Sequence, residues 1–266
     1  MSVEPIICFF NSVPDYVGEG VLKVVLTIIS ALIVGWITAR YFMRRDELTR
    51  IEGMLLEKKI PIYEHLSQQL TGMNELWALD PAYGQVAVDM LKRHGVETSG
   101  PMHIHKMLSD PEAFRTTFLE FEKYTIEHKL YFDEQTTLPI LVFTNYLAAI
   151  NRMGVHFEQE LSRLGVKTDN EVKKVEKHLY ATIGLLLRDD MADQIEKVDT
   201  AVMMSIQHLD FDHRKQPKYD YQMFRDPNGP MMKAMAETEF VKKRIVINEI
   251  IQDYILTVAA AKHIRI

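Results

Sequence analysis

The most constraining feature of this chain is an apolar segment from Val21 to Met43, VLKVVLTIISALIVGWITARYFM. No charged side chain occurs between Val24 and Ala39. As an α-helix rising ~1.5 Å per residue, the segment would reach roughly 34 Å, enough to cross a hydrocarbon core of about 30 Å. Because the stretch is apolar all round, it is unlike a one-sided interfacial helix. The sequence therefore predicts a single N-terminal transmembrane helix at 21–43.

The charges beside this span predict its orientation. Lys23 is the only basic residue before the apolar core, and the basic residues that follow it are Arg40, Arg44, Arg45 and Arg50. An excess of Lys and Arg marks the cytoplasmic flank of a span. We therefore expect a short external tail and a cytoplasmic C-terminal domain. The acidic start MSVEP, and the lack of a small-residue cleavage site after the apolar run, favour an uncleaved anchor over a signal peptide.

Four parts are expected along the chain: an external tail (1–20), the transmembrane helix (21–43), a juxtamembrane helical stalk (44–60) and a cytoplasmic α-helical domain (61–266). Apolar residues recur at helical spacing from Leu48 to Leu70, so the membrane helix is expected to continue into the stalk. Pro61 interrupts this stripe and predicts a kink or a break.

Beyond the stalk, the pattern is helical almost throughout and predicts an all-α bundle. Asp80 and Asp110 each precede a proline, as an N-cap precedes Pro at the first helical position. The segment GVETSGPMHIH is predicted to be a loop, DFDHRKQPKYDYQMFRDPNGP a loop docked on the bundle, and no strand is expected. The expected helices cover 81–94, 111–131, Thr137 to Gly165, 170–187 with Asp169 as its cap, Asp189 or Asp190 to His208, and Met231 to Ala261.

Composition narrows the function classes. The 266 residues carry a net charge of −6, which argues against nucleic acid as a partner. Cys8 is the only cysteine, so no internal disulfide can form; an external Cys8 could join two copies, and a buried apolar cysteine is the alternative. Phosphate-binding loops, dinucleotide fingerprints and nucleophile elbows do not occur in the sequence, and we expect no cofactor.

Two groups of residues resemble metal ligands. The segment HLDFDH places His208, Asp210, Asp212 and His213 within six residues, a donor set suited to a metal or to acid–base chemistry. The same residue types suit a helix end and a turn, which is the simpler interpretation. The second group is His94, His103 and His105. Without a Cys pair or a Glu-x-x-His motif, these are expected to be surface-loop histidines with no ligand role.

Small residues recur at every fourth position of the span: Thr27, Ala31, Gly35 and Ala39. Such a face lets two helix backbones approach closely and promotes lateral association in the membrane. The alternative is a single helix that faces lipid on all sides. The expected partners are therefore the lipid bilayer and either further copies of this chain or a cytoplasmic protein.

The layout of a short tail, a span ending in ITARYFMRRDE and a following helix KKIPIYEHLSQQL resembles a known but loose class of proteins. These are uncharacterised bacterial single-pass membrane proteins with a helical cytoplasmic domain, and the resemblance covers residues 20–70. Some members occur in anti-phage defence loci, as membrane effectors or sensors. The resemblance implies a location in the inner membrane of a bacterium and a membrane-bound role in antiviral defence, and it carries no functional residue over to this chain.

Three functions remain open. The first is a membrane-anchored, non-enzymatic interaction protein that could act as an effector by self-association. Because one span cannot line a pore, any pore would require oligomers. The second is a membrane-tethered signalling or sensing subunit of a larger complex, in which the stalk passes a change of state to the bundle. The third is a metal-dependent enzyme that uses HLDFDH, although the sequence assigns no catalytic residue.

Overall fold

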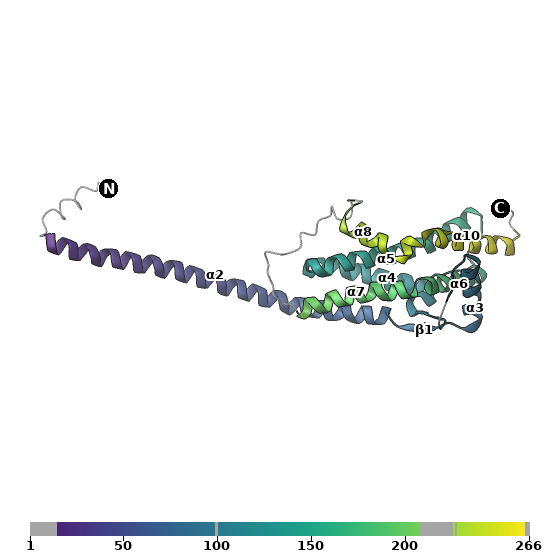
Figure 1. Ribbon diagram of the computed structural model, residues 1–266, viewed down its shortest axis with the longest axis horizontal. Coiled ribbons are helices and arrows are strands. Elements are labelled where there is room, and N and C mark those ends of the chain that lie inside the picture. The colour runs from purple at the N-terminus through teal and green to yellow at the C-terminus, as the bar shows by residue number, and fades with distance from the viewer. Residues whose placement is uncertain (1–14, 99–100, 208–225, 227, 264–266) are drawn as a thin grey trace. The chain divides into compact units, whose positions relative to one another are not determined.

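Helix α2 (Asp15–Met73) contains both the predicted span and the predicted stalk (Figure 1). It continues through Pro61, so the predicted break there is wrong. Proline removes one backbone hydrogen bond, but Tyr63 and Leu66 in the next turn are fully buried, and their packing outweighs that loss. The computed structural model describes residues 15–98, 101–207, 226 and 228–263, and within these the side chains of 15–31, 44–49, 51, 52, 55, 134 and 207 lie outside the description.

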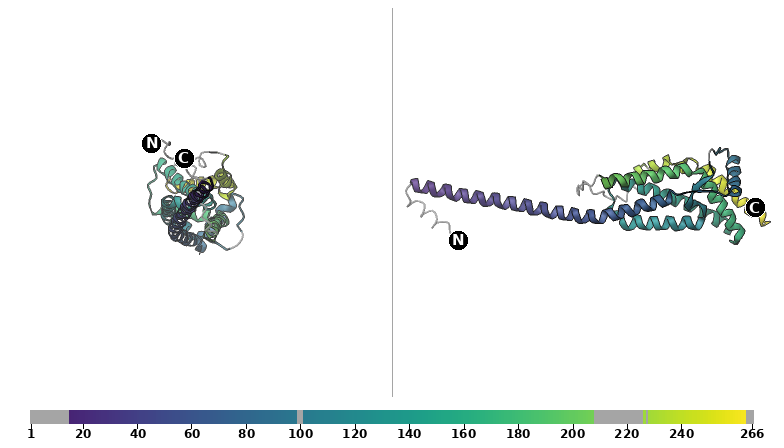
Figure 2. Two further views of the ribbon diagram at one scale, coloured as in Figure 1. Left: turned by 90° about the vertical axis from the view of Figure 1, so that its left-hand side faces the viewer. Right: turned by 90° about the horizontal axis from the view of Figure 1, so that it is seen from below.

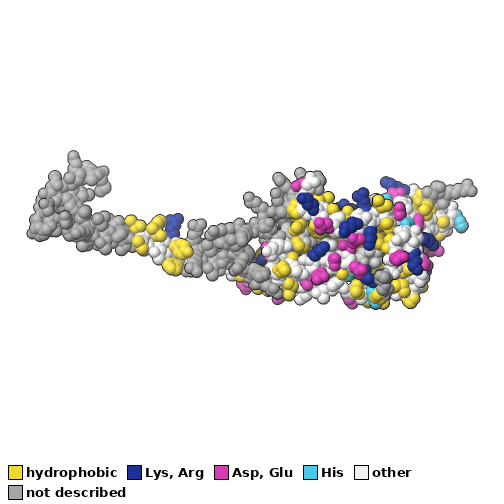
Figure 3. Space-filling view, in the orientation of Figure 1, with side chains coloured by type: hydrophobic (Ala, Val, Ile, Leu, Met, Phe, Trp, Pro, Cys, Tyr) yellow, Lys and Arg dark blue, Asp and Glu magenta, His cyan; other side chains and the backbone are white. Residues whose placement is uncertain are grey.

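The chain divides into two units between Glu57 and Lys58, and each unit has its own internal structure. In the first unit, every residue from Leu32 to Met43 is helical and exposed. This stretch is apolar, and Figure 3 shows it as a largely hydrophobic surface with one basic area. Nothing in the described part of this unit buries these side chains.

The second unit, Lys58–Ile266, is built almost entirely of helices, which confirms the predicted all-α class. After the C-terminal turns of α2, its elements are β1 (Leu76–Ala78), α3 (Pro81–Arg93), β2 (His103–His105), the short 3-10 helix η1 (Lys106–Ser109), α4 (Pro111–His128), the 3-10 helix η2 (Lys129–Tyr131), α5 (Glu134–Arg163), α6 (Asn170–Leu186), α7 (Arg188–Gln207), α8 (Pro230–Glu237), α9 (Glu239–Lys242) and α10 (Arg244–Ala261).

The helices of this unit surround one large hydrophobic core, and a small second cluster joins α5 to α8. Helix α5 packs against α4 and α7, α3 packs against α6, and α10 contacts both α5 and α6. Figure 2 (right) shows the long helices of the bundle side by side, in agreement with Figure 1. The C-terminal turns of α2 belong to this core as fully as the bundle helices do. The largest fully buried side chains include Tyr63, Leu66, Leu70, Phe114, Phe121, Phe143, Tyr146, Phe157 and Tyr180.

Several predicted helix ends are confirmed in atomic detail. The carboxylates of Asp80, Asp110 and Asp169 each accept a backbone N–H two or three residues further on, at 2.9 to 3.0 Å. These bonds satisfy amide groups that have no partner inside the helix. After α5, Gly165 adopts a φ of 72°, a left-handed conformation that ends the helix with little strain because glycine has no Cβ.

The predicted loop before α4 contains a strand. Strand β2 lies within that segment and pairs antiparallel with β1, so that Trp77 lies opposite Ile104. The expectation that no strand would form is therefore wrong. Each strand has only three residues, too few for an alternating pattern to appear in the sequence.

The predicted final helix from Met231 to Ala261 is three helices. Thr238 ends α8 and caps α9 with its side chain, and Lys243 separates α9 from α10. The prediction of one continuous helix is wrong because a threonine hydroxyl competes for backbone N–H groups at such a point. The apolar face of this segment is buried: Phe240, Ile247, Ile251, Tyr254, Ile255 and Val258.

One stretch of the described residues is long and apolar enough to cross a membrane, and it is Gln135–Arg163 in α5. Half of that stretch is buried inside the unit. Phe143, Tyr146 and Leu147 on it are fully buried in the core. Its apolarity is therefore accounted for by its place in the bundle.

Candidate functional site

The predicted metal-binding segment HLDFDH lies outside the described residues, since His208, Asp210, Asp212 and His213 all fall within 208–225. In the described ranges, no group of three or more His, Cys, Asp or Glu side chains is placed to hold a metal ion. A role for HLDFDH therefore stays a prediction.

The small-residue face of the predicted span lies on α2. Gly35 and Ala39 are helical and exposed, and a Cβ atom added to Gly35 would meet no atom within 4 Å. Thr27 and Ala31 lie in the same helix, but their side chains are outside the description. The described half of this face is therefore open to a neighbouring helix.

The arginines that follow the apolar core of the predicted span also lie on α2. Arg40 and Arg50 are exposed, whereas the side chains of Arg44 and Arg45 are outside the description. The Arg40 guanidinium lies 5.2 Å from the centre of the Trp36 ring, a cation–π distance. Tryptophan beside arginine is typical of the headgroup layer, where an amphipathic ring and a cation both find suitable surroundings.

The structure separates the three histidines that the sequence grouped. His94, at the C-terminal end of α3, lies between two carboxylates of α10. Its Nδ1 is 3.3 Å from Glu249 and its Nε2 is 3.1 Å from Asp253. These carboxylates face opposite nitrogens of one ring, so the three side chains link α3 to α10 and do not converge on one ion.

His105 is fully buried on β2, so its assignment as a surface-loop histidine is wrong. Its Nδ1 lies 3.2 Å from the Met73 carbonyl oxygen and its Nε2 lies 3.0 Å from the Arg188 carbonyl oxygen. A neutral imidazole has one N–H and can donate to only one of these acceptors. Burial lowers the pKa of His105 and outweighs the opposite effect of the two carbonyl groups.

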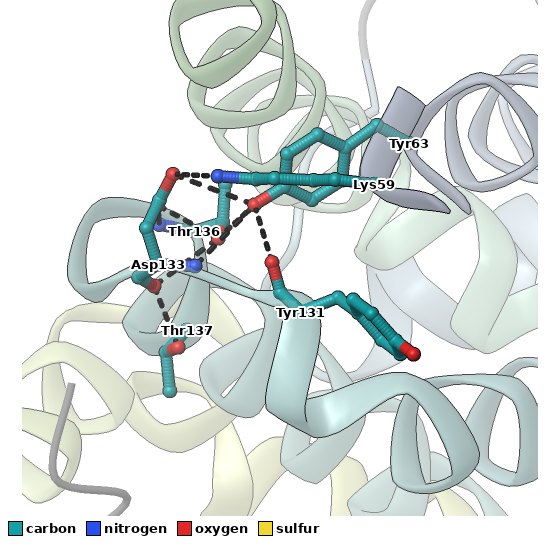
Figure 4. Close-up of polar contacts among 6 residues, drawn as sticks. All are labelled: Lys59, Tyr63, Tyr131, Asp133, Thr136 and Thr137. Carbon is teal, nitrogen blue, oxygen red and sulfur yellow. Dashed lines mark hydrogen bonds and ion pairs between the residues drawn. The ribbon is translucent and has the colours of Figure 1, made fainter. Parts of the chain in front are cut away.

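A polar network joins α2 to the start of α5, and we take it as the candidate functional site (Figure 4). We call it the α2–α5 node; its members are Lys59, Tyr63, Tyr131, Asp133, Thr136 and Thr137. Two of them come from α2, and the others come from the turn between α4 and α5 and from the first turn of α5. The node therefore fixes the point at which α2 enters the bundle.

Asp133 is the centre of the node. The Lys59 ammonium donates to its Oδ2 at 3.0 Å, and the Thr136 backbone N–H and hydroxyl donate to its Oδ1, each at 2.9 Å. The Thr137 hydroxyl donates to its carbonyl oxygen at 2.6 Å. Asp133 is thus the N-cap of α5, which begins at Glu134 rather than at the predicted Thr137.

The Tyr63 hydroxyl makes the second set of hydrogen bonds in the node. It lies 3.3 Å from the Tyr131 carbonyl, 3.2 Å from the Thr136 hydroxyl and 3.4 Å from Asp133 Oδ2. The Tyr63 ring stacks on Phe132 at a centroid distance of 6.0 Å. The phenol therefore ties a buried turn of α2 to the chain segment just before α5.

The electrostatics of the node favour a charged pair. Burial by itself would raise the pKa of Asp133, but the nearby Ser205 hydroxyl, the Thr136 N–H and the Lys59 ammonium hold it below its ordinary value. Burial raises the pKa of Tyr63, so its phenol stays protonated. Lys59 is only 6% exposed, and a buried ammonium needs such a partner. The node is an ion pair supported by hydrogen bonds, an arrangement suited to holding two elements in register.

A second polar cluster links α4, α5 and α6. The Arg115 guanidinium lies 2.7 Å from Glu158 and 3.5 Å from Glu176, and Tyr180 is fully buried beside them. Burial raises the pKa of Glu176, and the Glu158 carboxylate adds to that effect. Among the described atoms, Arg115 Nε and the Tyr180 hydroxyl are buried without a hydrogen-bond partner.

The sequence pointed to neither cluster in advance. Tyr63 fits the Leu66–Leu70 stripe and reads there as an ordinary core residue. Asp133 precedes a threonine-rich helix start and is a usable N-cap signal, but the predicted helix begins three residues too late. Lys59 carries no signal, because its burial depends on partners distant in the sequence. Comparisons of the chain with protein-family models, with curated proteins and with solved structures found no match.

Proposed function

We propose that this chain is a membrane-anchored, non-enzymatic interaction protein whose span occupies 21–43 and whose helical bundle lies in the bacterial cytoplasm. The observation that carries the proposal is the exposed apolar stretch Leu32–Met43 of α2. Its large side chains are half to three-quarters exposed, for example Leu32 at 68% and Met43 at 73%. Moving one such side chain out of water gains about 1.5–3 kcal/mol. A lipid bilayer would bury all of them together.

Two apolar helical stretches among the described residues differ in whether their own unit buries them. The stretch Gln135–Arg163 is half buried by its own unit and needs no membrane. Leu32–Met43 has no such burial within the described part of its unit, and the apolar sequence extends beyond it to Val21. This contrast favours the N-terminal stretch as the anchor. The excess of arginine after it favours a cytoplasmic bundle and an external N-terminus.

Replacement of apolar residues of the span by lysine tests whether the span anchors the chain in the membrane. Ile33→Lys combined with Ile37→Lys places two charges in the apolar stretch, each of which costs about 2.5–3.5 kcal/mol near the centre of a membrane helix. After cell lysis and carbonate extraction, the native chain should remain in the membrane pellet and the variant should appear in the supernatant. A native chain that is released by carbonate would contradict the proposal.

We further propose that copies associate in the membrane, as an effector of the kind found in anti-phage defence loci would. The open face at Gly35 and Ala39 supports this, because small residues let two helices approach closely. Gly35→Leu should reduce association of the span in a two-hybrid assay in the membrane, and Ile33→Val, on the opposite side of the helix, should not. Equal signals from both variants would argue against this face.

The node favours one alternative, a membrane-tethered signalling or sensing subunit. α2 is one helix whose C-terminal turns are core and whose entry point is held by Lys59 and Asp133. A change at Lys59 or Tyr63 would act directly on the start of α5 through the node. Because the enzyme alternative depends on HLDFDH alone, metal analysis of the purified chain is its test, and a bound stoichiometric metal would favour it.

A further inference from the structure

The contact among α4, α5 and α6 holds one cation between two carboxylates. Nη2 of Arg115, on α4, donates to Glu158 of α5 at 2.7 Å and lies 3.5 Å from Glu176 of α6. The first distance is a normal hydrogen bond, and the second lies beyond the usual range of about 2.7–3.2 Å. We call Arg115, Glu158, Glu176 and the neighbouring Tyr180 the Arg115 junction.

Glu176 is the member of this junction that carries a charge away from water. Its side chain is 8% exposed, against 40% for Glu158 and 34% for Arg115. Glu158 therefore has both the short bond to Arg115 and access to solvent, whereas Glu176 has neither. A buried carboxylate without a close counter-charge is unfavourable, and binding a proton relieves that penalty.

The other charged groups that act on Glu176 do not supply the missing counter-charge. The Asp110 carboxylate, at the start of α4, adds a second nearby negative charge. Lys177 is next in sequence to Glu176, but its ammonium pairs with Asp110 at 2.7 Å. Lys173, one turn earlier on α6, is exposed, so water screens its attraction.

We propose that Glu176 is a proton-binding site that controls how tightly α4, α5 and α6 are held together. When Glu176 is charged, two carboxylates compete for one guanidinium. When Glu176 is neutral, Arg115 pairs with Glu158 alone. The proton also gives Glu176 an O–H donor, and the Tyr180 hydroxyl, four residues further along α6, is fully buried without a hydrogen-bond partner among the described atoms.

The electrostatics of the junction agree with its geometry. Burial and the Glu158 carboxylate raise the pKa of Glu176, and Arg115 offsets only part of that rise. The stability that the neutral carboxyl provides is therefore complete below the ordinary glutamate pKa of 4.5 and is lost as the pH rises through the folded-state value. Acidification thus strengthens this contact. The inference concerns the bundle alone and is independent of the proposed membrane anchor.

Glu176→Gln tests the site, because glutamine resembles a protonated glutamate in shape and cannot ionise. Thermal unfolding of the full chain in detergent is measured from about pH 8 down to about pH 5. At the alkaline end the variant should unfold a few degrees above the native chain. The difference should shrink as the pH falls and the native Glu176 binds its proton.

An ordinary stabilising ion pair between Arg115 and Glu176 would give the opposite sign. Removal of one partner of such a pair is destabilising, so the variant would then unfold below the native chain at alkaline pH. That result, a variant that does not fold, or a difference that is the same at every pH would overturn the inference.

Glu158→Gln gives a second test, because it leaves Glu176 as the remaining carboxylate on Arg115. In that background Glu176→Gln should lower the unfolding temperature, since the guanidinium loses its last counter-charge. A rise in both backgrounds would contradict competition for Arg115. Glu196→Gln, at an exposed position of α7, changes the net charge equally and should follow the native chain at every pH. A rise as large as that of Glu176→Gln would assign the effect to net charge and overturn the inference.

Discussion

At the scale of single residues, the node shows how one carboxylate can serve two elements. Asp133 caps α5 with one oxygen and neutralises the buried Lys59 with the other. Loss of either partner of a buried ion pair leaves an uncompensated charge, which costs more than the pair itself contributes. Substitution at Asp133 should therefore affect both the start of α5 and the anchorage of α2.

Asp133→Ala removes the cap and the counter-charge together. An N-cap contributes about 1 kcal/mol and a hydrogen bond to a charged group about 1.5–3 kcal/mol, so the free energy of unfolding should fall by about 2.5–4 kcal/mol. Asp133→Asn keeps an oxygen for the cap and should lose roughly half as much. Thermal unfolding of the full chain in detergent, followed by near-UV circular dichroism, measures both changes.

The exposed carboxylate of Asp193 on α7 provides the control. Asp193→Ala should change the free energy of unfolding by only the few tenths of a kcal/mol that are typical of surface positions. Equal effects of Asp133→Ala and Asp193→Ala would show that the node does not stabilise the bundle.

His105 predicts a dependence of stability on pH. Its folded-state pKa lies below that of an unfolded histidine, because burial opposes the charged form. The unfolded chain then binds the proton more readily, so the contribution of His105 is complete above about pH 6.5 and declines as the pH falls below it. Burial lowers the pKa of His178 in the same direction. In a pH series of unfolding temperatures, His105→Gln should have a shallower acid slope than the native chain, and an unchanged slope would refute this assignment.

At the scale of elements, capping residues made the helices predictable. Asp80, Asp110 and Asp169 start helices where the sequence placed them, because a cap is a local interaction that the sequence records. α7, in contrast, begins at Arg188, before the predicted Asp189 or Asp190, since it follows α6 almost directly. The β1–β2 pair was missed because three-residue strands are formed by partners distant in the sequence.

Two helical glycines should respond oppositely to alanine. Gly72 on α2 has open space around its missing Cβ, so Gly72→Ala should stabilise the bundle by about 0.5–1 kcal/mol through helix propensity. Gly154 on α5 packs against the fully buried Tyr180 hydroxyl, and a Cβ there would collide with it. Gly154→Ala should destabilise the bundle by about 1–3 kcal/mol. The unfolding temperature of each variant is compared with that of the native chain. Shifts of the same sign in both variants would contradict this packing.

In the molecule as a whole, the helical bundle could be predicted from the sequence, whereas the node could not. An all-α bundle followed from periodicity and caps, and the structure confirms it. The node could not be predicted, since Lys59 and Asp133 lie 74 residues apart and only the fold brings them together. The membrane anchor is a proposal that follows from apolarity and flanking charge in the sequence and from the exposed side chains of Leu32–Met43 in the structure.

The central proposal is that the N-terminus lies outside the membrane and that the helical bundle lies in the cytoplasm. Cys8, the single native thiol, lies before the proposed span, and Asp193→Cys in a Cys8→Ser background places the only thiol in the bundle. Both full-length chains are treated in intact spheroplasts with a maleimide that cannot cross membranes. We predict that Cys8 is labelled directly and that the bundle thiol is labelled only after permeabilisation. Direct labelling of the bundle thiol, with Cys8 protected until permeabilisation, would contradict the account.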